Sequence, residues 1–261
     1  MTLGRLAPRL PVARYPSASR DRHRLEHPPL KADSFHANLV AVPCALAVLD
    51  QTHPGDTIYL GAEGELEFTI GQQVFLLKPR DLLAIPVGTV YSYANVGLAN
   101  AVMLGTFAAD PEPGAVSGKV EHMVWQQYSA RFGWTLPLAE QWGYHRGHTV
   151  RIPMAQFTPW HHVPRDLYFM VLQGEIEFGA GGKVWKLLPY DLLLVPAGTS
   201  HQYPNNTLAE TLFYSMGGKL PPGKKGVYFT EDPDWPIRAH ALAFLVELDP
   251  YGDACLVANA A

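Results

Sequence analysis

Residues 190–205 read YDLLLVPAGTSHQYPN, and residues 80–95 read RDLLAIPVGTVYSYAN, so the chain nearly repeats this stretch at an offset of 110 positions. Each copy contains a short apolar run, a Pro-x-Gly turn and a segment that ends in Asn. Working outward at the same offset, residues 64–68 (GELEF) correspond to residues 174–178 (GEIEF) without a gap. The sequence therefore predicts a duplicated domain.

Short apolar segments separated by turn residues fill each copy. Residues 66–70 alternate apolar and polar side chains, Gly71 interrupts them, and a second apolar segment follows at 74–77. A turn at 79–81 precedes another apolar segment at 82–85. Alternation with period two predicts strands, and several short strands in each half are typical of a barrel or jelly roll. We expect an all-β protein with two tandem jelly-roll β-barrels.

Composition shifts divide the chain into four regions. Residues 1–30, rich in Arg and Pro, predict an irregular N-terminal arm, and residues 31–115 predict the first barrel. Residues 116–140 predict a linker region with a short helix, because apolar residues recur at helical spacing over 120–131. Residues 141–261 predict the second barrel and a C-terminal tail.

Overall composition limits the classes of partner. The chain has 261 residues, of which 48% are apolar and 17% charged, and its net charge is −4. The chain has no excess of basic residues that would attract nucleic acid. It also lacks an uninterrupted apolar run of about 18 residues, so no membrane span is predicted. Two cysteines, Cys44 and Cys255, and the lack of a hydrophobic signal segment predict a cytoplasmic protein without disulfides.

The repeated turn resembles a motif of the cupins, and the duplication resembles the two-barrel bicupins. Their second motif, G-x5-P-x-G-x2-H-x3-N, is matched from Tyr190, which replaces the leading Gly, through Pro196, Gly198, His201 and Asn205. This resemblance covers residues 38–108 and 148–218 and implies two cupin barrels.

The first cupin motif, H-x-H-x3-E-x6-G, is matched less well. Counting back from Gly174 places His161 at the first His, Val163 at the second His and Leu167 at the Glu. In cupins the two motifs hold a divalent metal with three His and one carboxylate. The resemblance therefore implies His161 and His201 as metal ligands, with Fe(II) favoured and Mn, Ni, Co or Zn as alternatives.

Two further candidate ligands, His162 and Asp166, lie one residue from the motif positions. Side chains alternate faces along a strand, so His161 and His162 both point inward only if a bulge interrupts the strand. With a bulge, His161, His162 and His201 form a three-His site with Asp166 as a possible fourth ligand. Without a bulge, only one of His161 and His162 points inward, and it shares the site with His201. Asp166 has an alternative role in a turn, since Asp56 repeats it. His161 has an alternative role as a hydrogen-bonded surface residue at the barrel rim, and His201 has one as the remnant of a metal site.

The first barrel departs from both motifs. It has His53 at the second His position, but Gln51, Thr57 and Tyr91 occupy the other ligand positions. We expect no metal there and a structural or dimerising role, within a homodimer formed through sheet edges or the N-terminal arm.

Three functions are consistent with these residues. The first is a mononuclear non-haem metal dioxygenase that acts on a small organic substrate. The second is a non-redox metal-dependent isomerase, cyclase or lyase, which requires a general base near the ion; Tyr168, Tyr203 and Gln202 are the polar candidates. The third is a non-enzymatic bicupin that binds a small ligand. We favour the dioxygenase because sites of this kind often carry out that chemistry in the family that the chain resembles.

Overall fold

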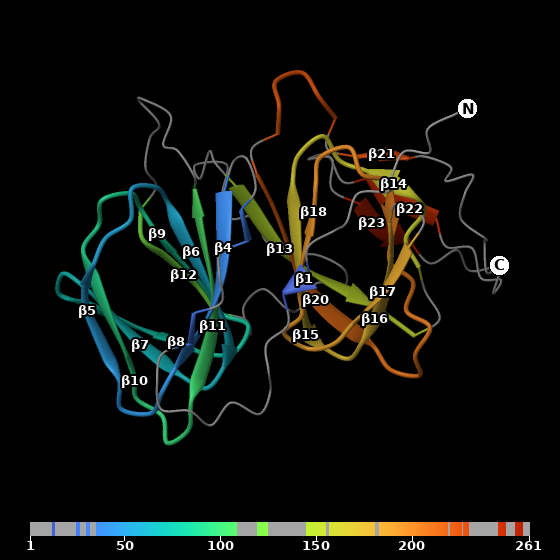
Figure 1. Ribbon diagram of the computed structural model, residues 1–261. Coiled ribbons are helices and arrows are strands. Elements are labelled where there is room, and N and C mark those ends of the chain that lie inside the picture. Colours follow the sequence, from blue (N-terminus) through green and yellow to red (C-terminus); the bar gives the residue numbers. More distant parts are fainter. Residues whose placement is uncertain are drawn as a thin grey trace, which may run out of the picture. The chain divides into compact units, whose positions relative to one another are not determined.

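The structure is a computed structural model. It describes residues 35–108, 119–124, 145–154, 157–180, 183–218, 220–225 and 227–229, and the short strands at 12–13, 25–26, 30–31, 245–248 and 254–257. Every regular element in these residues is a β-strand (Figure 1). The described part of the chain accordingly has no helix that could span a bilayer.

The chain divides into two compact units, and the first barrel belongs to the unit Ala13–His148 with Met216–Lys219. One of its sheets consists of β2 (Leu25–Glu26), β3 (Leu30–Lys31), β4 (Phe35–Val42), β6 (Thr57–Glu63), β9 (Leu82–Ile85), β11 (Ala101–Ala108) and β12 (Glu121–Met123). The order is β12-β9-β6-β11-β4-β2, and β3 also pairs with β4. The other sheet, in the order β5-β10-β7-β8, consists of β5 (Ala47–Gln51), β7 (Leu66–Ile70), β8 (Gln73–Leu77) and β10 (Tyr91–Asn95).

The second barrel belongs to the unit Thr149–Ser215 with Met1–Val12 and Leu220–Ala261. One sheet, in the order β1-β18-β15-β20-β13, consists of β1 (Val12–Ala13), β13 (His145–Ile152), β15 (Leu167–Gln173), β18 (Leu192–Val195) and β20 (Thr211–Gly218). The other, in the order β17-β16-β19-β14-β21, consists of β14 (His161–His162), β16 (Ile176–Ala180), β17 (Lys183–Leu187), β19 (His201–Gln202) and β21 (Tyr228–Phe229). A separate hairpin pairs β22 (Leu245–Leu248) with β23 (Ala254–Val257).

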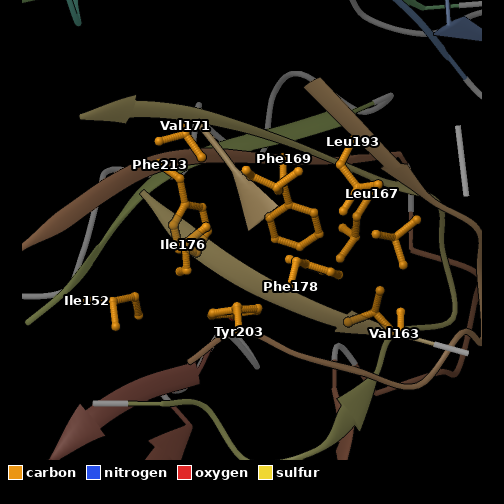
Figure 2. Close-up of a cluster of buried hydrophobic side chains, with 13 residues drawn as sticks. Ile152, Val163, Leu167, Phe169, Val171, Ile176, Phe178, Leu193, Tyr203 and Phe213 are labelled. Carbon is orange, nitrogen blue, oxygen red and sulfur yellow. The ribbon is translucent and has the colours of Figure 1, made fainter. Parts of the chain in front are cut away.

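The two sheets of each barrel enclose one apolar core. Alternate residues of the central strands, such as Phe169 and Val171 on β15 and Ile176 and Phe178 on β16, point into the second barrel and pack together (Figure 2). Figure 2 also shows Tyr203 beside Phe178 in this cluster. The first barrel has an equivalent core of its own. The prediction of two tandem jelly-roll barrels is confirmed.

The residues that identified the repeat hold the same turns in both barrels. Asn95 Nδ2 donates to the carbonyls of Val42 and Ala99, both at 2.8 Å. Asn205 Nδ2 donates to Ile152 (2.8 Å) and Ala209 (2.7 Å) in the same way. Both Asn side chains are buried and bridge the end of one strand to a loop. The repeat therefore reflects backbone groups that each barrel must satisfy.

The predicted linker helix is wrong where the structure describes it. Glu121–Met123 form β12, which pairs antiparallel with β9 at the edge of the larger sheet, and residues 125–131 lie outside the described residues. The apolar spacing suited a helix. However, β9 is buried, so the backbone N–H and C=O groups on its edge away from β6 need a partner strand. Sheet pairing therefore outweighs the local periodicity.

Candidate metal centre

Two histidines meet inside the second barrel. His161 on β14 and His201 on β19 are directly opposite each other in antiparallel pairing, so their side chains leave the sheet on the same face. The ring centroids are 4.3 Å apart with an angle of 56° between the planes. Both side chains are buried, His201 completely. Neighbouring strands thus place two imidazoles within reach of a single ion, which each would bind at about 2.1 Å.

Hydrogen bonds fix which ring nitrogen of each histidine is available. His161 Nδ1 lies 2.8 Å from the Pro159 carbonyl, and His201 Nδ1 lies 2.8 Å from the Thr199 carbonyl. A carbonyl only accepts, so both Nδ1 atoms donate and both Nε2 atoms keep a lone pair. His201 Nε2 is buried and has no hydrogen-bond partner in the described protein. Metal-binding histidines are held in this way, with the second ring N–H donated to a carbonyl.

Burial keeps both imidazoles uncharged. It lowers the pKa of His161 to about 4, a shift that the hydrogen bond to Pro159 partly offsets and the neighbouring His162 increases. Burial also lowers the pKa of His201 well below its usual value, and the adjacent His161 adds to this effect. Neutral imidazole is the form that binds a metal, so the pair is available for an ion at pH 7 without losing a proton.

Aromatic side chains surround the histidine pair. Phe178 stacks on His201 with centroids 5.5 Å apart, and Phe169 meets the same ring edge-on at 5.8 Å. Tyr203 approaches His161 edge-on at 5.6 Å and stacks on His201 at 6.2 Å. These rings exclude water from the imidazoles, which explains the low pKa values and strengthens any electrostatic interaction there.

His162 does not join the pair. His161 and His162 pair with the consecutive residues Phe229 and Tyr228 of β21, so the strand continues without the bulge that a three-imidazole site requires. The His162 ring stacks on Tyr228 instead, with centroids 5.1 Å apart and only 4° between the planes. Regular strand alternation therefore places His162 on the face opposite His161.

Asp166 serves the turn rather than the pair. Its Oδ1 accepts the Ala197 amide at 2.8 Å, and Asp56 Oδ1 accepts the Val87 amide at the same distance in the first barrel. This is the alternative role that the repetition of Asp suggested. In the described residues, no group of three His, Cys, Asp or Glu side chains is arranged to hold a metal. His161 and His201 are the candidate ligands that the structure brings together.

The three candidate acid–base residues are placed differently. Tyr203 is buried beside both imidazoles. Tyr168 lies between Leu167 and Phe169, which both point into the core, so it points to the other face of β15. Gln202 separates the inward-facing His201 and Tyr203 and is likewise directed away. Only Tyr203 of the three is close to the histidine pair.

Sequence reasoning missed the groups that orient the imidazoles. The carbonyls of Pro159 and Thr199 each accept from a His two residues later, and Phe178 forms one wall of the site. Every residue has a backbone carbonyl, so the sequence does not indicate which carbonyls accept these hydrogen bonds. Phe178 had one available signal, because it occupies an inward position of the alternating segment 176–180.

Solved structures similar to this chain include two-barrel oxygenases. Salicylate 1,2-dioxygenase from Pseudaminobacter salicylatoxidans superimposes with a TM-score of 0.62 at 12% identity, covering 76% of each chain. A variant of this enzyme from Pseudoaminobacter salicylatoxidans in complex with gentisate gives a TM-score of 0.64 at 11% identity, covering 82% of this chain and 83% of the other. AerE from Microcystis aeruginosa gives a TM-score of 0.62 at 12% identity, covering 77% and 94%.

The family comparison is independent of these superpositions. No curated protein matches the sequence. The cupin domain model matches residues 42–107 and again residues 148–217, one match in each barrel. With two matches and two jelly-roll barrels, the chain belongs to the cupin family as a two-barrel bicupin.

Proposed function

We propose that the second barrel holds one divalent metal ion through Nε2 of His161 and His201, and that the protein is a dioxygenase-type cupin acting on a small organic substrate. The observation that carries this proposal is the orientation of two buried, neutral imidazoles: each donates Nδ1–H to a carbonyl and keeps Nε2 for a ligand. The unpartnered Nε2 of His201 fits the same assignment, because a buried polar atom without a partner is costly.

The side chains around the pair suit this chemistry. Two imidazole ligands leave coordination positions for a substrate, and Fe(II), when bound, would supply the activation of dioxygen. His161 and His201 would hold the ion, and Phe169 and Phe178, which pack on the His201 ring, would exclude water from the site. Tyr203, whose ring centroid lies 5.6 Å from that of His161, offers a phenolic hydroxyl as a proton donor or acceptor.

The structural neighbours support the substrate class. Salicylate 1,2-dioxygenase shares the two-barrel fold, and one of its structures holds gentisate. The rings of Tyr203 and Phe178 beside the imidazoles would favour a planar aromatic substrate of this kind over an aliphatic one, since aromatic rings pack on one another. Small hydroxylated aromatic acids are therefore the first substrates to assay.

A second candidate function is a bicupin that binds a small ligand without catalysis. It is favoured by one observation: in the described part of the chain no third metal-binding side chain joins His161 and His201. Two protein ligands bind an ion more weakly than three or four, so occupancy decides between the two candidates.

The test is the metal content of the full-length protein purified without added metal, measured by mass spectrometry. We expect about one Fe per chain in the wild type and its loss in His161→Ala and His201→Ala. His162→Ala is the matched control, because its ring stacks on Tyr228, and should keep the metal. Zn, Mn or Ni at that level would replace the dioxygenase assignment by isomerase or lyase chemistry. Absence of metal would leave the ligand-binding function.

A second readout does not depend on activity. In ¹⁵N NMR spectra of the metal-free protein, His161 and His201 should both show Nδ1 protonated and Nε2 unprotonated at pH 7. Added Zn²⁺ should shift both Nε2 resonances and leave those of His162 unchanged. Equal shifts at His162, or none at His201, would contradict the proposed ligands.

A further inference from the structure

The candidate metal centre is closed to solvent in this structure. His161 is 4% exposed and His201 is 0% exposed, and Nε2 of His201, the atom that would bind an ion, is itself buried. Neither an ion nor an organic substrate can reach these nitrogens while every surrounding element stays in place. If the pair binds a ligand, as proposed above, an element at its rim must move first.

The short strand β21 lies at such a rim. Of the two strands that flank β14, β19 lies inside the sheet and β21 lies at its edge (Figure 1). In the first barrel Gln51 of β5 corresponds to His161, and β5 is itself the edge of its described sheet, with no counterpart of β21 beside it. The additional edge strand thus accompanies the barrel in which the imidazoles meet.

Side chains at β21 alternate between the two faces of the sheet. Val227, just before the strand, packs against the core of the second barrel. Phe229 pairs directly with His161, so it leaves the sheet on the same face, and it is 48% exposed. Tyr228, between them, points to the outer face. On the inner face His161 therefore lies between His201 and the half-exposed Phe229, which marks the solvent side of the pair.

A short pairing, the packing of Val227 and one ring stack hold β21 against the barrel. The pairing with β14 involves only two residues of each strand. On the outer face the Tyr228 and His162 rings stack almost in parallel at 5.1 Å, and Tyr228 Oη accepts the Lys225 amide at 3.1 Å. Residues 221–225, which precede the strand, are all exposed. Such an edge opens at a lower free energy than the buried strands of a barrel.

From these observations we infer that β21 is a gate, which moves away from β14 to admit the ligands of the imidazole pair and is held closed by the stack of Tyr228 on His162. His162 is then a positioning residue of the gate rather than a ligand. The inference rests on the proposed function for what enters. A gate that opens more readily speeds entry and exit together, so the equilibrium metal content expected for His162→Ala is unchanged.

The experiment treats the full-length, metal-free protein with diethylpyrocarbonate and follows each histidine by mass spectrometry of peptides. The reagent transfers an ethoxycarbonyl group to an unprotonated imidazole nitrogen and releases ethanol and carbon dioxide, so Nε2 of His201 reacts only when the gate is open. Tyr228→Ala removes the ring stack and should speed the modification of His201 by about two- to tenfold. Tyr228→Phe keeps a ring on His162 and should stay within about twofold of the wild-type rate.

Val184→Ala is the matched control, because Val184 is also half-exposed but lies on β17, the opposite edge of the same sheet. It should leave the rate at His201 unchanged. In low urea the wild-type rate should rise little, since opening a two-residue strand exposes little surface, whereas reaction through global unfolding rises steeply. The gate is overturned if Tyr228→Ala reacts at the wild-type rate, if Val184→Ala speeds the reaction equally, or if the urea dependence matches that of global unfolding.

This readout needs no metal, so failure of the gate and failure of the metal centre are distinguishable. Zn²⁺ is the probe for the second. If the wild type binds Zn²⁺ while Tyr228→Ala changes neither the uptake of the ion nor the modification of His201, the gate is wrong and the metal centre stands. Gated modification in a protein that binds no Zn²⁺ supports the gate and contradicts the metal centre; the gate then admits the small ligand of the second candidate function.

Discussion

At the scale of single residues, Asp56 and Asp166 accept the same backbone hydrogen bond but have different surroundings. Asp56 is fully buried, and its Oδ2 has no hydrogen-bond partner in the described protein. Burial raises the pKa of Asp56, and the hydrogen bond from Val87 offsets this only partly. Asp166 is partly exposed. The same turn thus costs more in the first barrel, where a carboxylate must ionise away from water.

Replacing the charge tests this difference. A raised pKa means that the unfolded state releases the proton first, so the contribution of Asp56 to stability falls as the pH rises above the usual value of 3.8. Asp56→Asn keeps an oxygen acceptor for Val87 without the charge. We expect this variant to have a larger free energy of unfolding than the wild type at pH 7, and the gain should shrink as the pH falls toward 4.

Urea unfolding between pH 4.5 and 8 measures the effect. Asp166→Asn, the equivalent substitution in the second barrel, is the control and should show a smaller pH-dependent difference. A gain for Asp56→Asn that is the same at every pH would show that the carboxylate charge is not the cause.

At the scale of elements, the strand ends of both barrels depend on a buried Asn. Asn205 Nδ2 bridges the carbonyls of Ile152 and Ala209, and its Oδ1 accepts the amide of Thr207 at 3.0 Å. The side chain thereby joins the end of β13 to the loop before β20. Without it the Ile152 carbonyl and the Thr207 amide would lose this hydrogen bond, while the Ala209 carbonyl would keep the one from Thr207 Oγ1.

We expect Asn205→Ala to lower the free energy of unfolding by about 3 kcal/mol, at roughly 1 kcal/mol for each of its three hydrogen bonds to backbone groups. Asn206→Ala is the control, because the Asn206 side chain is exposed and, among the described residues, donates to the exposed side of the barrel at Glu177, so its loss should cost less than about 0.5 kcal/mol. If chemical denaturation gave equal decreases in the free energy of unfolding for the two variants, the assigned role of Asn205 would be contradicted.

At the scale of the whole molecule, each barrel has its own core, and the polar side chains inside the two barrels differ. The cluster around Phe178 fills the second barrel and the cluster around Phe68 fills the first. Duplication supplied the scaffold twice, while the inward positions differ: imidazoles meet in one barrel and phenolic hydroxyls in the other. The fold therefore does not specify the chemistry, which lies in a few interior side chains.

Metal binding should couple to global stability. A ligand that binds only the folded state adds about 2.7 kcal/mol at a concentration 100 times its Kd. We expect Fe(II), added anaerobically, to raise the Tm of the wild type by several degrees and to leave His161→Ala and His201→Ala unchanged. Differential scanning calorimetry measures both. An identical increase in the His201→Ala variant would place the metal elsewhere.

The sequence by itself determined the duplication and the all-β class, and it supplied His161 and His201 among the candidate ligands. These follow from local features of the sequence, namely the alternation of apolar and polar residues, the Pro-x-Gly turns and the spacing of the second cupin motif. The buried Asn95 and Asn205 were equally visible, because a residue that satisfies fixed backbone groups must recur with the turn it holds.

Only the tertiary structure decided which candidates meet. Whether His162 faced the interior depended on the pairing of β14 with β21, and the helix predicted near Glu121 gave way to pairing with β9. The contact between Tyr59 and Tyr91 joins residues 32 positions apart on opposite sheets. Such contacts depend on strand register and burial, which are set by the whole barrel and leave no local pattern to read.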